Sequence, residues 1–410
     1  MAPADFPASD ARLLLFNTRT QRKELFEPTG NPVTLYVCGV TPYDTTHLGH
    51  ARTYLVFDIL QRHLMAQNLA VRYVQNVTDI DDPLFERAAK LGVDFMQLAD
   101  ECIDIFLNDL DALNIMRPTV FPRVRDEIPG ILDMVQLLVD NGMAYPRDGR
   151  VYFRAARFPG YADMSLLDRQ GMLAANAETG EDPEDPRKED PLDFRLWRPS
   201  APGEPAWPTP WGSGRPGWHI ECSSMANRHL GPQVDIHGGG EDLVFPHHCD
   251  EIAQSESATG VRPFVRYWMH VGIVRMDGEK MSKSRGNLAF VRDLVPEFGG
   301  NALRYYLLGF SYRSQFEYVA RDLAIAAERW RGIADACRGP MEAPDPSPEG
   351  DRLSRLVRAS LDNDLDTPAA LAAITELGER IAEDQHPGDR AVLRQIAADL
   401  GFRFDSDTGA

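Results

Sequence analysis

The stretch Tyr36-Val-Cys-Gly-Val-Thr-Pro-Tyr-Asp-Thr-Thr-His-Leu-Gly-His50 decides how this sequence is interpreted. It carries an apolar β-type run, Val33–Cys38, through turn-forming residues into a segment whose apolar spacing predicts a helix. A strand, a glycine-containing turn and a helix start form an anion site, because unpaired backbone N–H groups of the first helical turn face the ligand. His47 and His50 could donate hydrogen bonds to phosphate there, while Gly49 lets the backbone come close. An isolated motif of this length can equally be a surface turn that contains two histidines.

A second strand after this helix defines the fold class. Val71–Val77 is a β-type run, so strand, helix and strand predict a βαβ unit and hence a parallel sheet. Three carboxylates follow directly in Asp79-Ile-Asp-Asp82, at the edge where parallel sheets bind ligands. These acids could instead cap a helix, because Asp is favoured at N-caps and in first turns. The sequence predicts an α/β protein with a Rossmann-type catalytic domain.

A loop rich in lysine and serine lies more than two hundred residues further along. Its sequence, Lys280-Met-Ser-Lys-Ser-Arg-Gly-Asn287, is suited to holding a polyphosphate. With the histidine turn it resembles the HIGH and KMSKS signatures of class I aminoacyl-tRNA synthetases, which activate an amino acid with ATP and Mg²⁺. The resemblance implies catalytic roles for His47, His50, Lys280 and Lys283. It implies nucleotide binding by Gly39, Thr41, His47, Gly49, His50, Gly239, Asp242 and Lys283.

Scattered residues form a candidate metal site. His247 and Glu251 are four positions apart, which puts both on one face of a helix beginning after Pro246. Cys38 ends the strand before the histidine turn, so a metal bound there would lie beside the nucleotide. Cys222 supplies a second thiolate, and thiolate, imidazole and carboxylate groups are all accepted zinc ligands. Such wide spacing is a weak signal on its own, since buried cysteine is common in packed cores.

A more specific resemblance covers about residues 13–400. The segments that carry it are Cys38-Gly39 before the histidine turn, 76–82, 214–222, 235–240, 245–248 and 280–284. They are similar to cysteinyl-tRNA synthetases. In that family the residues matching Cys38, Cys222, His247 and Glu251 hold one zinc ion, which takes the substrate thiolate as a further ligand. The resemblance also implies that Cys38, Thr78, Trp218 and His219 contact the amino acid.

Selection of cysteine over serine fits zinc chemistry. Zinc prefers sulfur to a hydroxyl, whereas an apolar pocket discriminates by only about 1–3 kcal/mol. No candidate editing domain is evident in the sequence. A nucleotidyltransferase would share the histidine turn but has no use for a sulfur-rich metal set. A catalytically silent paralogue is disfavoured by the intact signatures.

Several features depart from the family pattern. Cys249 stands where the family usually has an acid, and on a helix it would point away from the face of His247 and Glu251, as a bystander thiol. Pro83 replaces the usual lysine, although Pro is also common in a first helical turn. The sequence ends near residue 410, so we expect the usual anticodon-binding tail to be missing.

The acceptor of the activated cysteine is therefore an open question. The sequence at 41–44 and 82–87 resembles that of a sister family, the mycothiol-pathway ligases, which join cysteine to an amino sugar–inositol. Arg52 and Asp250–Ser255 follow the tRNA-enzyme pattern instead. We predict ATP-dependent activation of L-cysteine with tRNA(Cys) as the favoured acceptor and the amino sugar as the alternative. A tRNA acceptor requires a basic face on the C-terminal helices, for which the candidates are Arg352, Arg355, Arg358, Arg380, Arg390 and Arg394.

Composition sets the remaining expectations. The 410 residues are 43% hydrophobic, and no apolar run approaches the roughly 20 residues that span a bilayer. Five irregularly spaced cysteines argue against a disulfide framework and favour a reducing compartment. The first residues lack a secretory signal, so we expect a cytoplasmic protein. We also expect it to be a monomer. The net charge of −19 disfavours non-specific coating of nucleic acid but allows a local basic groove.

The expected domain organisation follows the motifs. Residues 174–187 are rich in Pro and acids without a period, which predicts a mobile loop within the insertion. The expected parts are 1–130, first half of the catalytic domain; 131–215, connective insertion; 216–295, second half with the zinc site and Lys280 loop; 296–337, stem-contact helices; 338–351, linker; and 352–402, helical bundle.

Overall fold

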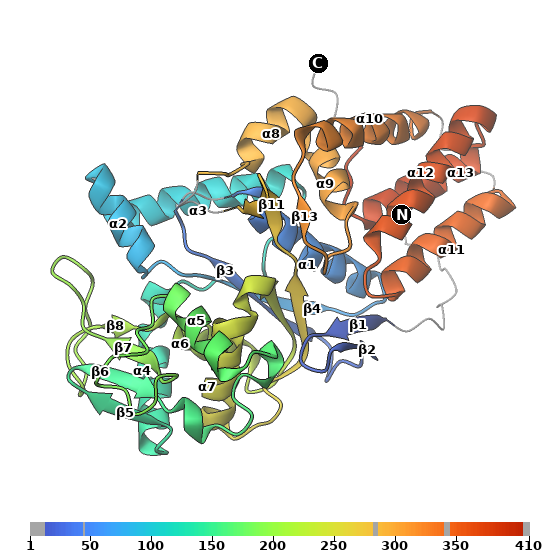
Figure 1. Ribbon diagram of the computed structural model, residues 1–410. Coiled ribbons are helices and arrows are strands. Elements are labelled where there is room, and N and C mark those ends of the chain that lie inside the picture. Colours follow the sequence, from blue (N-terminus) through green and yellow to red (C-terminus); the bar gives the residue numbers. More distant parts are fainter. Residues whose placement is uncertain (1–12, 44–45, 282–285, 340–344, 405–410) are drawn as a thin grey trace.

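The computed structural model describes residues 13–43, 46–281, 286–339 and 345–404. A parallel sheet that includes β3 and β4 lies at its centre (Figure 1). It has four strands in the order β10-β9-β3-β4. The strands are β3 (Val33–Val40), β4 (Val71–Val77), β9 (Val234–Gly240) and β10 (Val265–Val271). Strand β3 is covered on both faces, which explains its nearly continuous apolar sequence. The predicted α/β fold with a parallel sheet is confirmed.

The two faces of this sheet pack against different parts of the chain. Alternate side chains of a strand point to opposite faces, and on β3 they join two separate cores. Leu35 and Val37 pack with α1 (Leu48–Ala66) and the C-terminal helices. Tyr36 and Cys38 pack with α4 (Val124–Asp140), α6 (Trp218–Leu230) and the insertion. Cys38 therefore faces the insertion side, at the carboxyl end of the sheet.

Gly39 is required where β3 passes β4. A Cβ atom at this position would lie 1.5 Å from the carbonyl oxygen of Asn76, which no side chain can satisfy. The Gly39 N–H donates instead to Asn76 Oδ1 at 2.8 Å. The register of the two strands shifts between Val37 and Val40, at this close approach. Beyond this shift β3 still pairs with β4, Val40 opposite Val77, before the chain leads to α1.

The insertion contains an antiparallel sheet, β5-β6-β7-β8. Its strands are β5 (Ala144–Arg147), β6 (Arg150–Phe153), β7 (Phe194–Arg198) and β8 (Arg215–Pro216). The loop predicted at 174–187 is wrong at 174–178, which belong to α5 (Arg169–Glu178), a helix capped by Asp168. Residues 179–187 lie outside any helix or strand. The segment that follows is tied down by Glu181, whose buried carboxylate pairs with Lys188 at 2.9 Å and Arg195 at 2.7 Å.

Helices dominate the rest of the chain. After β4 the chain forms α2 (Asp82–Leu91), α3 (Phe95–Ala112) and α4, where apolar residues recur at helical spacing. The helical bundle expected at 352–402 is present as three helices, α11 to α13. The remaining elements are β1 (Leu14–Asn17), β2 (Arg22–Leu25), α7 (Cys249–Thr259), β11 (Val274–Met276), β12 (Glu279–Lys280), α8 (Val291–Phe298), α9 (Gly300–Leu308), β13 (Phe316–Glu317), α10 (Ala320–Ala336), α11 (Pro348–Asp362), α12 (Thr367–Asp384) and α13 (Pro387–Asp399).

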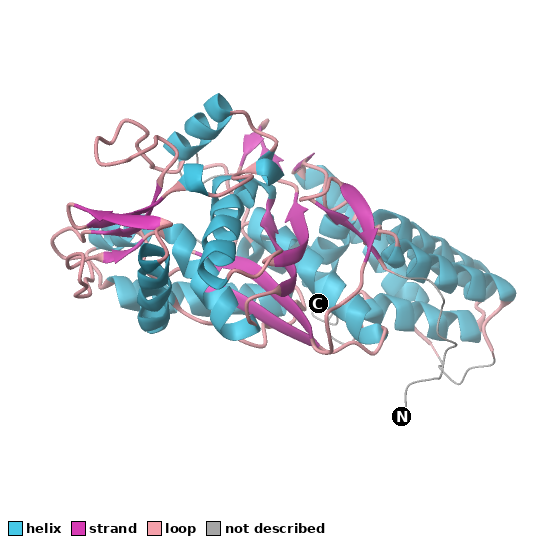
Figure 2. Ribbon diagram, turned by 90° about the horizontal axis from the view of Figure 1, so that it is seen from below, coloured by secondary structure: helices cyan, strands magenta, loops and turns pink. Residues whose placement is uncertain are grey.

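The C-terminal helices stand at the opposite end of the molecule from the insertion sheet (Figure 2). The basic face expected on them is wrong at Arg390, which is buried and donates to the Ala336 carbonyl at 3.0 Å and to Gln385 at 2.7 Å. Arg352 is paired with Glu349 and Glu376. Within the described residues, no helix is long and apolar enough to cross a membrane.

Candidate active site and metal centre

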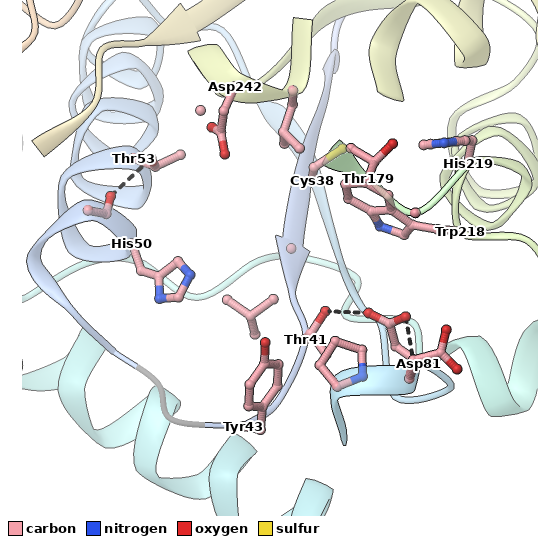
Figure 3. A pocket seen from close by; sticks show the side chains of 18 of the residues that line it. Cys38, Thr41, Tyr43, His50, Thr53, Asp81, Thr179, Trp218, His219 and Asp242 are labelled. Carbon is pink, nitrogen blue, oxygen red and sulfur yellow. Dashed lines mark hydrogen bonds between the residues drawn. The ribbon is translucent and has the colours of Figure 1, made fainter. Parts of the chain in front are cut away.

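A pocket of about 910 Å³ opens at the carboxyl end of the parallel sheet (Figure 3). Its floor is the end of β3, with Cys38, Gly39 and Thr41, and one wall is the first turns of α1. The start of α6, the insertion and the segment 271–274 complete it. The volume is in the upper range of small-molecule sites and is large enough for an adenylate.

The histidine turn forms the N-terminus of α1, as predicted. His47 caps the helix, and its Nδ1 accepts the Gly49 N–H at 3.1 Å. The rings of His47 and His50 are stacked, with centroids 3.8 Å apart. A Cβ on Gly49 would come within 2.9 Å of the His47 ring, so glycine is needed for this cap. The positive end of the helix dipole and two imidazoles thus face the pocket together.

Most of the expected nucleotide-binding residues line the pocket. Gly39, Thr41 and Asp242 lie along it, together with the histidine turn. Gly239 does not line it; the neighbouring Gly240 does, while a Cβ on Gly239 would meet the Leu243 side chain at 2.8 Å.

Lys280 lines the same pocket as the histidine turn, from β12. Its Nζ lies 2.6 Å from Asp242 Oδ2, and both side chains are about half exposed. The ion pair therefore faces solvent within reach of a bound nucleotide. Lys283 lies outside the described residues.

The expected metal ligands come together in one buried cluster. The ligand atoms of Cys38, Cys222, His247 and Glu251 all lie within 4.8 Å of one another. The two sulfur atoms are 3.9 Å apart, Cys38 Sγ is 3.5 Å from Glu251 Oε1, and His247 Nε2 is 3.1 Å from the same oxygen. Tetrahedral zinc with bonds of about 2.0–2.3 Å separates its ligands by roughly 3.3–3.8 Å. The spacing fits a metal ion.

Buried polar atoms in the cluster also fit a cation. His247 Nε2 and Glu251 Oε2 are buried and have no hydrogen-bond partner among the described residues. Burial holds the pKa of His247 well below its usual value, which keeps the imidazole neutral as a ligand must be. Burial likewise raises the pKa of Cys38 and of Glu251, and the negative charge of the neighbouring Cys222 thiolate raises both further. A cation would remove that penalty.

Neighbouring side chains fix the orientation of the cluster. His247 Nδ1 lies 2.8 Å from His219 Nδ1, which leaves Nε2 facing the other ligands. Asp250 lies 3.4 Å from the far side of His219 and accepts the Tyr161 hydroxyl at 2.6 Å. The indole of Trp218 stacks on the His247 ring with centroids 4.2 Å apart. Second partners of this kind set the tautomer and direction of a metal-binding imidazole.

The sequence did not anticipate two further histidines at the cluster. His237 and His248 place their Nε2 atoms 3.6 and 3.3 Å from Cys38 Sγ, and both are fully buried. Their signal was weak, because each lies far from Cys38 in sequence. Cys249 packs in the apolar core and belongs to no metal-binding group among the described residues, as expected of a bystander.

The expected substrate residues divide into two groups. Cys38, Trp218 and His219 line the pocket (Figure 3). Thr78 is buried behind it, where its hydroxyl accepts from Asn76 Nδ2 at 3.2 Å and its N–H donates to the Val40 carbonyl at 3.0 Å.

The acids after β4 both cap a helix and face the pocket. Asp81 caps α2 and accepts the Thr41 hydroxyl at 3.3 Å. Asp82 is held by short contacts to Arg198 and Arg215 of the insertion, which the sequence did not reveal. Pro83 lies in the first turn of α2, where its missing N–H costs nothing. The structural explanation of Pro83 that the sequence left open is therefore sufficient.

Solved structures share the fold at low sequence identity. Mycobacterium tuberculosis methionyl-tRNA synthetase in complex with methionyl-adenylate aligns with a TM-score of 0.62 at 18% identity, over 90% of this chain and 89% of that one. A leucyl-tRNA synthetase of Agrobacterium radiobacter K84 in a ternary complex with tRNA aligns with a TM-score of 0.63 at 14% identity, over 92% and 84%. At such identities the likeness shows the fold alone.

Sequence comparison places the chain within this fold. The family described as tRNA synthetases class I (C) catalytic domain matches residues 25–328. The cysteine--tRNA ligase of Anaeromyxobacter sp. (strain K) is 46% identical over 367 residues, which cover 87% of this chain and 75% of the relative. That of Dehalococcoides mccartyi (strain BAV1) is 43% identical over 411 residues, covering 96% and 88%.

This protein is a class I aminoacyl-tRNA synthetase. The evidence is its fold, the histidine turn at the start of α1, the hairpin that bears Lys280 and the match to the family model. Within that class the chain belongs to the cysteine--tRNA ligase family.

Proposed function

We propose that this chain activates L-cysteine with ATP and transfers the cysteinyl group to tRNA(Cys). The observation that carries the proposal is the buried cluster of Cys38, Cys222, His247 and Glu251, which reaches the nucleotide pocket at Cys38. A sulfur-rich metal site that opens beside the start of α1 suits a thiol substrate. An amino acid without a soft donor atom would have no favourable bond to make with such a metal.

In the activation step the cysteine carboxylate attacks the α-phosphorus of ATP and pyrophosphate leaves. His47 and His50, at the positive end of α1, would stabilise charge that develops on the phosphates. Lys280 would exchange its contact with Asp242 for the leaving group, and Lys283 would act beside it. Mg²⁺ would arrive with the nucleotide. No covalent enzyme nucleophile is needed.

Zinc is the metal that suits the cluster best. Two thiolates, a neutral imidazole and a carboxylate are all zinc ligands, and three of their separations, 3.1, 3.5 and 3.9 Å, are close to those of tetrahedral coordination. When bound, the ion would supply a Lewis-acidic site for the substrate thiolate. Trp218, stacked on His247, would form the wall against the amino acid, and His219 would hold His247 in its binding tautomer.

The amino-sugar acceptor is the less favoured alternative. It drew support from the sequence at 41–44 and 82–87 and from Pro83, and the first turn of α2 explains Pro83 structurally. The relatives that match most of this chain are named for tRNA ligation. We also propose a cytoplasmic, monomeric enzyme, in keeping with the five free cysteines.

The test is cysteine-dependent exchange of pyrophosphate into ATP, run without an acceptor. We expect exchange with cysteine, and exchange at least about 10²-fold weaker with serine at equal concentration. Transfer of [³⁵S]cysteine is then measured with tRNA(Cys) and with glucosaminyl-inositol. Exchange that does not depend on cysteine would refute the activation step. Transfer of cysteine to the amino sugar but not to tRNA at low salt would refute the proposal that tRNA(Cys) is the acceptor.

A further inference from the structure

Arg52 occupies an unusual position one turn into α1. Its side chain is buried, with 1% of the residue exposed. The guanidinium donates three short hydrogen bonds to backbone carbonyl oxygens: to Gly272 at 2.6 Å, and to Ser311 and Ser314 at 2.7 Å each. These carbonyls lie more than 200 residues away in sequence. One side chain thus joins α1 to two separate loops.

Among the described residues, no carboxylate lies within ion-pair distance of Arg52, so its charge has no salt-bridge partner there. Its hydrogen-bond acceptors are neutral carbonyls. The Phe316 ring lies 4.7 Å from the guanidinium carbon. Burial lowers the pKa of Arg52 to about 10, partly offset by Glu241, so the group remains charged at neutral pH. Burying an arginine in this way is costly, so its benefit must lie elsewhere than in net stability.

The three carbonyls mark the base of the small sheet that carries Lys280. Strand β11 follows Gly272 and pairs with β12, which contains Lys280, and with β13, which follows Ser314. Gly272 approaches the second loop closely, because a Cβ there would lie 2.4 Å from the Ser314 oxygen. Arg52 fastens this joint to the helix that begins at His47. The two catalytic walls of the pocket therefore meet through its guanidinium.

We propose that Arg52 is a positioning residue that sets the separation between the histidine turn and the hairpin bearing Lys280. The proposal rests on the adenylation function proposed above. Arg52 does not line the pocket, so it acts through the groups it holds. Lysine cannot replace it fully, because a single ammonium nitrogen cannot reach three separated carbonyls with the planar geometry of a guanidinium.

The first experiment separates positioning from folding. In Arg52→Ala, kcat for cysteine-dependent pyrophosphate exchange should fall about 10²-fold, the usual cost of a displacement near 1 Å. The KM for cysteine should stay within about threefold, because the metal cluster and Trp218 do not touch Arg52. Arg52→Lys should give an intermediate kcat, and added guanidinium ion should partly restore Arg52→Ala. Arg62→Ala is the matched control, since Arg62 lies on the same helix but binds Asp58 and the Asn114 carbonyl.

The second experiment does not depend on activity. Amide hydrogen exchange over 274–281 should accelerate in Arg52→Ala and in Arg52→Lys but not in Arg62→Ala. If amide hydrogen exchange over 274–281 were unchanged in Arg52→Ala, the proposal would be overturned, even if the wild-type protein showed no adenylation. A kcat of Arg52→Ala close to that of wild type would also overturn it, as would a rise in the KM for cysteine as large as the fall in kcat. A wild-type protein without exchange of pyrophosphate would count against the proposed function alone.

Discussion

The buried ion pair between Asp58 and Arg304 provides a quantitative test of how the C-terminal helices are attached. Asp58 lies in the middle of α1 and Arg304 on α9, and both side chains are fully inaccessible. Asp58 also accepts the Met116 N–H and Arg62 Nε, each at 2.9 Å. Replacing Asp58 by alanine strands a guanidinium in the core and removes the acceptor of a backbone N–H.

The expected cost follows from what remains. Breaking one side of a buried pair costs about 3–5 kcal/mol, because the partner charge stays desolvated. Arg304 keeps the Leu400 carbonyl at 2.6 Å and the Leu113 carbonyl at 2.9 Å, which softens the loss. Arg62 can turn to solvent, since its side chain is 18% exposed. We therefore expect Asp58→Ala to lower the free energy of unfolding by about 3–4 kcal/mol.

Urea unfolding, followed by both circular dichroism and tryptophan fluorescence, measures this change. The double variant Asp58→Ala/Arg304→Met removes the stranded charge and should recover at least about 1 kcal/mol relative to Asp58→Ala alone. A loss below about 1 kcal/mol in the single variant would show that the pair is not desolvated as the structure has it. Strictly additive effects of the two substitutions would equally refute the reasoning.

Three further outcomes test the site. Cys222→Ala should reduce the zinc bound per chain well below one equivalent, as measured by atomic emission after dialysis. Cys249→Ala is the control and should leave the zinc content unchanged. Equal zinc retention in the two variants would contradict the ligand assignment. Burial raises the pKa of Asp81 to about 6, so its folded form binds the proton more tightly than the unfolded chain, and its contribution to stability falls as pH rises from about 4 to 6. Asp81→Asn should therefore gain up to about 2–3 kcal/mol over wild type across that window in urea unfolding, and a constant difference would exclude this linkage. Lys280→Ala should lower kcat for pyrophosphate exchange by about 10²-fold, and near-normal exchange would remove Lys280 from the catalytic set.

Local periodicity explains why much of the fold could be predicted from the sequence. Val71–Val77 has the bounds of β4, because an apolar run between polar turns leaves little choice. The helices near 96–113 and 353–400 could also be predicted from the sequence, since their apolar residues recur at helical spacing. His247 and Glu251 are four residues apart, and this spacing correctly predicted that their side chains lie together, although the turn before α7 is an irregular helix.

Errors arose where long-range contacts override local composition. Residues 174–187 were predicted to form a mobile loop, but α5 extends to Glu178 and the buried Glu181–Lys188 pair holds the segment that follows. Arg390 looked exposed by its charge, yet backbone carbonyls satisfy it inside the bundle. The clamp of Asp82 by Arg198 and Arg215 joins positions more than 100 residues apart. No local pattern reports such pairings.

The strand order gives the molecule a tolerance to cleavage. The exposed turn at Ala201–Gly203 divides the chain into a part with β3 and β4 and a part with β9 and β10. In the sheet, β9 lies between β10 and β3, so the two parts share a ladder of backbone hydrogen bonds. The metal ligands are also split, with Cys38 before the cut and Cys222, His247 and Glu251 after it. A protease that nicked this turn would leave two polypeptides held as one particle, a natural starting point for a split enzyme reassembled by its own sheet.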